Sequence, residues 1–127
     1  MTLLLPYQYV VLRCVPRIER EEFVNVGVAV YCQRADFLRS AQLVDRDRLR
    51  ALAPDIDIDA VCAALTMIED VCQGVRGGGR PSLESPGRRF GWIPAPRSTV
   101  VQPGSVHGGL TADPARTLED LLERLVA

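Results

Sequence analysis

The chain has 127 residues, with 15 basic and 16 acidic side chains and a formal net charge of −1. This length fits a single domain over residues 1–127, and the balanced charge lacks the basic excess of proteins that bind nucleic acids or membrane surfaces, so we expect neither partner. All basic residues are arginine, which excludes a Schiff-base lysine and the lysine of a phosphate-binding loop.

The chain contains four cysteines, Cys14, Cys32, Cys62 and Cys72. They include no C-x-x-C pair, and there is one histidine, so the spacing of a zinc site is missing and we expect no metal and no cofactor. The first two cysteines fall in strand-like runs and the last two in a helical run, which predicts buried thiols rather than disulfides. The apolar run that ends at Pro6 lacks the basic start of a signal peptide, so we expect a cytoplasmic protein.

Residues 7–15 (YQYVVLRCV) are rich in β-branched and aromatic residues, which predicts a first strand. Only Gln8 and Arg13 interrupt its apolar character, so we expect a central position in which both faces are covered. Residues 37–44 (FLRSAQLV) predict a third strand, and the polar residues within it favour an edge position.

The clearest strand covers residues 23–32 (FVNVGVAVYC). Strict alternation predicts one apolar face directed at the core, made of Val24, Val26, Val28, Val30 and Cys32. On the opposite face Phe23 and Tyr31 flank smaller residues, which leaves room for a packed helix, a bulged neighbouring strand or a ligand. Asn25 lies on this face and needs a hydrogen-bond partner, so it is a candidate ligand-binding residue.

Three helices are predicted, each beginning at an aspartate cap: Asp45 for the first, Asp57 or Asp55 for the second, and Asp113 for the third. The first is short and ends before Pro54. The second continues to about Cys72 and carries an apolar stripe at three- and four-residue steps. The third has a proline at its first position and a stripe of leucines, so it should dock on the sheet.

Together these elements predict an α+β fold: a small antiparallel sheet of at least three strands, with two main helices packed on one face. Residues 74–91 are rich in Gly, Pro and Arg and predict a flexible loop. This loop is basic and the helix of residues 57–72 is acidic, so the two are either solvated or weakly docked together.

Residues 90–110 (FGWIPAPRSTVVQPGSVHGGL) hold the only tryptophan, Trp92, and the only histidine, His107. Their prolines and glycines exclude a regular helix, but their valines make them too apolar for a disordered linker. We therefore expect an ordered, irregular segment that crosses the sheet or extends it. Functional residues are often found in such segments.

Three segments occur in the order YQYVVLRCVPR, EEFVNVGVAVYC and APRSTVVQPGSVHGGLTADP. In these segments the chain resembles a bacterial family known as domain of unknown function 3037, and the resemblance covers nearly the whole sequence. It implies no activity, because none is established for the family. It does imply a partner, since the family is associated with gene neighbourhoods that encode a protein similar to HipA-type kinases.

Arg97, Ser98 and Thr99 offer a guanidinium group and two hydroxyls in succession, which are the donors that a phosphate or carboxylate needs. Alternatively, Arg97 bridges to a helix carboxylate while the two hydroxyl residues open an ordinary strand. His107 precedes two glycines and is either an acid–base group or a structural hydrogen-bonding residue. No G-x-S-x-G motif accompanies it, so the sequence shows no catalytic set of residues.

The absence of such a set favours a non-catalytic binding or accessory protein that acts with a protein partner, for which a HipA-like kinase is the candidate. The alternative is a small enzyme or a sensor of anionic ligands, in which Arg97, Ser98 and Thr99 hold the anion and His107 transfers a proton. A distance of more than about 10 Å between His107 and Arg97 would exclude that joint site, because it is far beyond hydrogen-bond reach.

Overall fold

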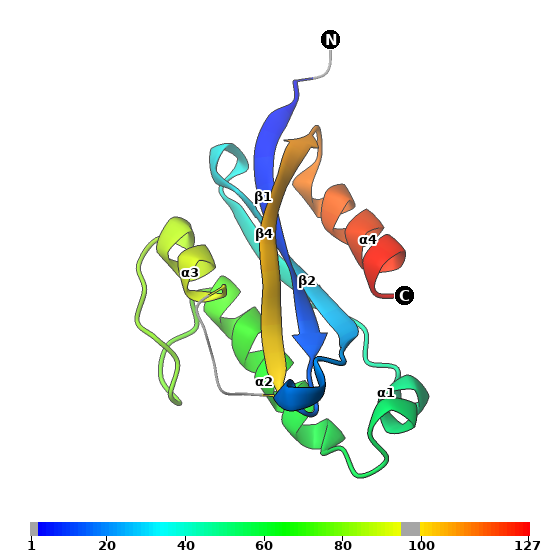
Figure 1. Ribbon diagram of the computed structural model, residues 1–127. Coiled ribbons are helices and arrows are strands. Elements are labelled where there is room, and N and C mark those ends of the chain that lie inside the picture. Colours follow the sequence, from blue (N-terminus) through cyan, green and yellow to red (C-terminus); the bar gives the residue numbers. More distant parts are fainter. Residues whose placement is uncertain (1–2, 95–99) are drawn as a thin grey trace.

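The structure is a computed structural model that describes residues 3–94 and 100–127. In chain order, with η for short 3-10 helices, its elements are β1 (Leu5–Cys14), η1 (Ile18–Arg20), β2 (Val24–Cys32), η2 (Gln33–Ala35), β3 (Phe37–Gln42), α1 (Arg46–Leu52), α2 (Ile58–Cys72), α3 (Pro86–Trp92), β4 (Val101–Thr111) and α4 (Pro114–Leu125). The strands form one sheet with helices on both sides of it (Figure 1).

The sheet of the described residues has four antiparallel strands in the order β3-β2-β1-β4. β1 is paired on both sides, so that Tyr9 lies opposite Val30 of β2 and opposite His107 of β4. The predicted α+β fold with an antiparallel sheet of at least three strands is therefore confirmed. The strand predicted from residues 7–15 takes the central position that its apolar character indicated.

β4 is a strand of 11 residues, where the sequence predicted an irregular segment. It extends the sheet next to β1, which is one of the two arrangements that the sequence left open. Pro103 fits in this strand because β4 lies at the edge of the sheet, where a missing N–H can face solvent. The pairing with β1 also shifts its register between Val10 and Leu12, beside this proline.

A bulge in β2 decides which side chains reach which face of the sheet. The register between β1 and β2 shifts between Leu12 and Arg13, and Val26 is skipped in the pairing. The alternation of side chains between the two faces therefore shifts by one residue at this point. Val26 packs in the core on one face, and Val28 packs in the core on the other. The prediction of a single valine face is wrong, because strict alternation holds only in an uninterrupted strand.

The two main helices lie on opposite faces of the sheet, whereas the sequence predicted them on one face (Figure 1). On one face α2 packs through Val61, Leu65 and Ile68. On the other face α4 packs through Leu118 and Leu121. Because the bulge makes both faces of β2 apolar, each face needs its own helix to exclude water.

The predicted helix starts are confirmed. The side chains of Asp45, Asp57 and Asp113 each accept a hydrogen bond from the backbone N–H three residues further on, at 3.1, 3.1 and 3.4 Å. These bonds satisfy N–H groups that have no partner within the helix. None of the helices in the described residues is long and apolar enough to span a membrane.

Residues 74–91 were predicted as a flexible loop, but the end of this segment forms the helix α3. Ser85 caps this helix and Pro86 occupies its first turn, a combination that favours a helix start. Earlier in the segment Arg80 forms an ion pair with Asp70 of α2, with a distance of 2.6 Å between Nη2 and Oδ2. The basic segment is therefore docked on the acidic helix.

Gly27 is a position at which the packing leaves no room for a side chain. A Cβ atom there would lie 2.9 Å from the carbonyl oxygen of Ala41 in β3 and 3.2 Å from Cδ1 of Leu12, and Leu65 of α2 lies just beyond at 3.5 Å. A packed helix, one of the alternatives that the sequence left open, is therefore observed at Gly27. Asn25, which the sequence placed on the same face, lies on the α4 side instead, because the bulge at Val26 separates the two residues.

We expect Gly27→Ala to lower the free energy of unfolding by about 1 to 3 kcal/mol, because a backbone oxygen in a paired strand cannot move aside freely. Gly91→Ala is the matched control: no heavy atom lies within 4 Å of a Cβ at that helical position. It should be neutral or stabilise the fold by up to about 1 kcal/mol. Urea denaturation of both variants measures the difference, and equal effects would contradict the close approach at Gly27.

Candidate functional site

Two of the predicted site residues lie in described strands, and three do not. Arg97, Ser98 and Thr99 fall outside the described residues, so their joint anion site with His107 stays a prediction. Asn25 donates a hydrogen bond from Nδ2 to the backbone oxygen of Leu125, at 3.0 Å. This bond joins β2 to the last turn of α4, so the hydrogen-bond partner that the sequence required is a helix carbonyl.

His107 is an exposed residue near the middle of β4. Its ring stacks on Tyr9 of β1, with 5.3 Å between ring centroids and 28° between the planes. Tyr9 in turn stacks on Tyr7, with centroids 6.1 Å apart. We call these three residues the aromatic row; it lies on the face of the sheet that α4 partly covers, since both tyrosines pack against the core of that face.

Gly109 explains how Tyr7 reaches β4. A Cβ on this glycine would lie 2.9 Å from Cε1 of Tyr7, so the tyrosine ring rests directly on the glycine backbone. The second of the two glycines that follow His107 thus has a packing role in the strand, because it accepts an aromatic ring from the neighbouring strand.

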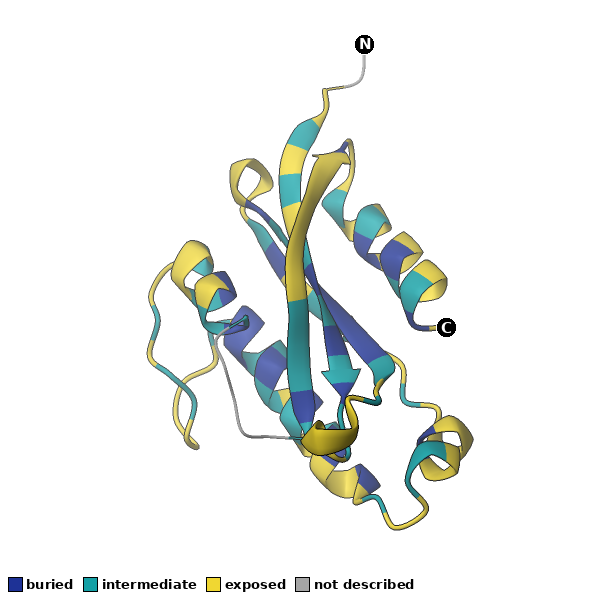
Figure 2. Cartoon of the chain, in the orientation of Figure 1, coloured by how far each residue is buried: buried dark blue, intermediate teal, exposed yellow. Residues whose placement is uncertain are grey.

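The opposite face of the same strands presents apolar side chains to solvent. Leu110, opposite Pro6 of β1, is 64% exposed, and Val106 is 43% exposed. Figure 2 shows the end of β4 as a continuous exposed stretch, in contrast to the buried start of the strand. We call Pro6, Val106 and Leu110 the apolar patch. Exposed apolar side chains on one face of an edge strand are typical of interaction surfaces.

The outer edge of β4 is open over residues 105–110, which are all exposed. β4 is the last strand of the sheet formed by the described residues. The backbone groups on its outer side therefore pair with no other strand of that sheet. Residues 101–111 contain no charged side chain, whereas β3 at the other edge carries the exposed Arg39. Charges, prolines and bulges usually protect edge strands. In β4 the proline, Pro103, comes before residue 105 and leaves residues 105–110 without such protection. We call residues 105–110 the open edge.

The thiols do not supply a nucleophile to this site. All four cysteines are free; three are buried and Cys62 is half-buried. Burial raises the pKa of the Cys14 thiol from 9.0 to about 11 and that of Cys72 to about 12, because a thiolate loses its hydration there. Within residues 3–94 and 100–127 no group of His, Cys, Asp and Glu side chains could hold a metal ion.

Sequence reasoning singled out His107 but missed Tyr7 and Tyr9. The available signal was the two-residue spacing of the tyrosines, which places both rings on one face of a strand. Which strand would lie beside them was not contained in that spacing, because β1 and β4 are separated by most of the chain.

Comparison with known proteins gives one match. A family model described as "Protein of unknown function (DUF3037)" matches residues 9–126, which confirms the resemblance seen in the three sequence segments. No curated protein and no solved structure matches the chain.

The buried thiols predict a loss of stability at alkaline pH. In the unfolded chain both thiols ionise near their ordinary pKa of 9.0, but in the folded chain Cys14 stays neutral to about pH 11 and Cys72 to about pH 12. The unfolded state therefore releases protons first, and the free energy of unfolding falls from about pH 9 upward until the folded-state pKa values are reached.

Urea denaturation at pH 7, 9 and 10.5 measures this slope. The double variant Cys14→Ala with Cys72→Ala should be less stable at pH 7, where both thiols are neutral, but should show a smaller decrease above pH 9. If the wild type and the double variant decrease in parallel, the thiols do not cause the pH dependence.

Proposed function

Since the chain belongs to the DUF3037 family, whose description assigns no activity, we propose its function from the geometry: it is a non-catalytic binding or accessory domain, and a protein partner docks on the open edge of β4. The observation that supports this proposal is an exposed, uncharged edge of residues 105–110 beside exposed apolar side chains. An extended segment of the partner adds a strand to the sheet there, and its backbone pairs with the free N–H and C=O groups of β4.

The side chains on the two faces of β4 supply the specificity of this docking. An added strand alternates its side chains between the two faces, so some of them meet the aromatic row and the others meet the apolar patch. Covering Leu110 and Val106, which are already partly shielded, would contribute roughly 1 to 2 kcal/mol each. Stacking on His107 and Tyr9 adds contacts that favour an aromatic or apolar residue of the partner.

The HipA-like kinase that the family resemblance implies is the first partner to test, in the bacterial cytoplasm where we expect the chain to act. An accessory role of this kind needs no catalytic group in the chain itself. It also agrees with the position of His107, whose ring packs on Tyr9 and forms no hydrogen bond or ion pair with another described residue.

We expect Leu110→Glu to weaken binding of the partner at least about tenfold, because it places a charge where the added strand must exclude water. Its side chain is mostly exposed, so stability should change by less than about 0.5 kcal/mol. Ile18→Glu is the matched control: Ile18 is 59% exposed but lies in η1, outside β4. Co-purification of the tagged chain with the HipA-like kinase, followed by titration of the complex, measures both variants.

Three outcomes would contradict the proposal. One is that no protein from the native host is recovered above background. Another is that the partner binds Leu110→Glu and Ile18→Glu equally well. A third is that light scattering shows a homodimer that Leu110→Glu dissociates, since the open edge would then be occupied by a second copy of this chain.

A further inference from the structure

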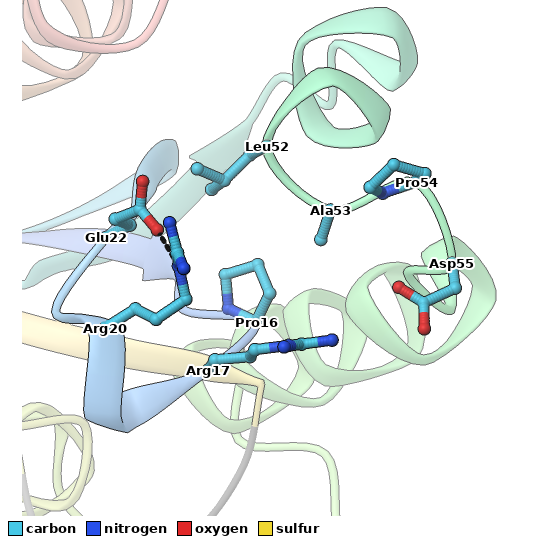
Figure 3. Close-up of a pocket in the computed structure, with 8 residues that line it drawn as sticks. All are labelled: Pro16, Arg17, Arg20, Glu22, Leu52, Ala53, Pro54 and Asp55. Atoms are coloured by element: carbon cyan, nitrogen blue, oxygen red, sulfur yellow. Dashed lines mark hydrogen bonds and ion pairs between the residues drawn. The ribbon is translucent and has the colours of Figure 1, made fainter.

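A pocket beside α1 has opposite charges on its walls (Figure 3). It lies between the turn that follows β1, which includes Pro16 and Arg17, and the residues after α1, which include Pro54 and Asp55. Its volume is about 220 Å³. A second hollow of about 230 Å³ shares part of this lining and continues toward the start of α2.

Arg17 and Asp55 supply the two charges of this pocket that no described residue pairs. Figure 3 shows the Arg17 side chain extending along the pocket toward Asp55, yet the two form no ion pair, and neither side chain has a hydrogen-bond or ion-pair partner among the described residues. Arg20 also lines the pocket, but Glu22 neutralises it in an ion pair. One guanidinium group and one carboxylate, both without a partner among residues 3–94 and 100–127, therefore face the same small volume.

The backbone around the pocket is held in place without a ligand. On one side the N–H of Glu21, which has a left-handed φ of 54°, donates to the oxygen of Ile18 at 3.1 Å. On the other side the N–H of Ala53 donates to the oxygen of Leu49 at 2.9 Å. The N–H of Ile56 donates in turn to the oxygen of Ala53 at 3.1 Å. A ligand that enters the pocket therefore has little backbone to order, which favours affinity.

We infer that this pocket binds a small zwitterion, an α-amino acid with an apolar side chain. The ligand carboxylate accepts hydrogen bonds from the planar guanidinium fork of Arg17. The ligand ammonium group donates to the carboxylate of Asp55. The apolar side chain of the ligand packs on the remaining walls, which are formed by Pro16, Leu52, Ala53 and Pro54.

The two opposite charges discriminate against simpler ligands. An anion that approaches Arg17 also approaches Asp55, which repels it. A cation that approaches Asp55 is likewise repelled by Arg17. A zwitterion satisfies both groups at once. The second hollow, which shares part of the pocket lining, adjoins Val100 just before β4 begins, whereas the open edge lies at residues 105–110. This inference therefore does not rest on the proposed protein partner.

Titration of the wild-type chain, followed by the amide signals of Arg17, Ala53 and Asp55 in ¹H–¹⁵N NMR spectra, tests the inference with three compounds. L-leucine is the zwitterion; L-leucinamide lacks the carboxylate, and N-acetyl-L-leucine lacks the ammonium group. We expect saturable shifts with L-leucine and at least about tenfold weaker binding of each blocked compound. Equal affinity for all three, or no saturable shift with L-leucine, would overturn the inference.

Substitution of the two charges provides a second test. Arg17→Gln and Asp55→Asn should each weaken binding of L-leucine at least about tenfold, because each leaves one ligand charge without a partner. Arg34→Gln in η2 is the matched control, since this exposed arginine lies outside the pocket. Unchanged affinity in Arg17→Gln would overturn the inference. The comparison of the three compounds on the wild-type chain stands even if a variant fails to fold.

Discussion

The skipped residue Val26 is the point in β2 on which the packing of both faces depends. Upstream and downstream of it the valines of β2 point to different faces, so neither face can be left to solvent. α2 covers one face and α4 covers the other, and the hydrogen bond from Asn25 to the last turn of α4 fixes the second helix beside the bulge. One extra residue in a strand thus determines a layered arrangement of helix, sheet and helix.

The same arrangement explains why β4 is open. α4 contacts β2 and β3, and the main contacts of α2 in the sheet are with β3. The two helices therefore cover mainly the half of the sheet that is formed by β2 and β3. β4 is held chiefly by its pairing with β1 and by rings that rest on it, as Tyr7 does on Gly109. Its second half therefore keeps an accessible backbone edge and accessible faces, although it is a long and regular strand.

Charge is distributed unevenly over this fold. The open edge has none, the edge formed by β3 carries Arg39, and the pocket at the other end of β4 combines Arg17 with Asp55. An uncharged edge suits backbone pairing with a protein segment, because an added strand need not desolvate a charge. A pocket with both charges suits a small polar ligand. The two surfaces therefore call for different partners, and both can be occupied at once.

The sequence by itself determined the local elements. The aspartate caps, the apolar stripes of α2 and α4 and the β-branched runs of the strands each depend on neighbours within a few residues, so their spacing was sufficient to predict them. The tertiary structure alone decided the bulge at Val26, the pairing of β1 with β4, the stacking of His107 on Tyr9 and the placement of Arg17 and Asp55 in one pocket. Each of these joins residues that are distant in the chain or depends on how one strand fits its neighbours, and no local periodicity encodes that fit.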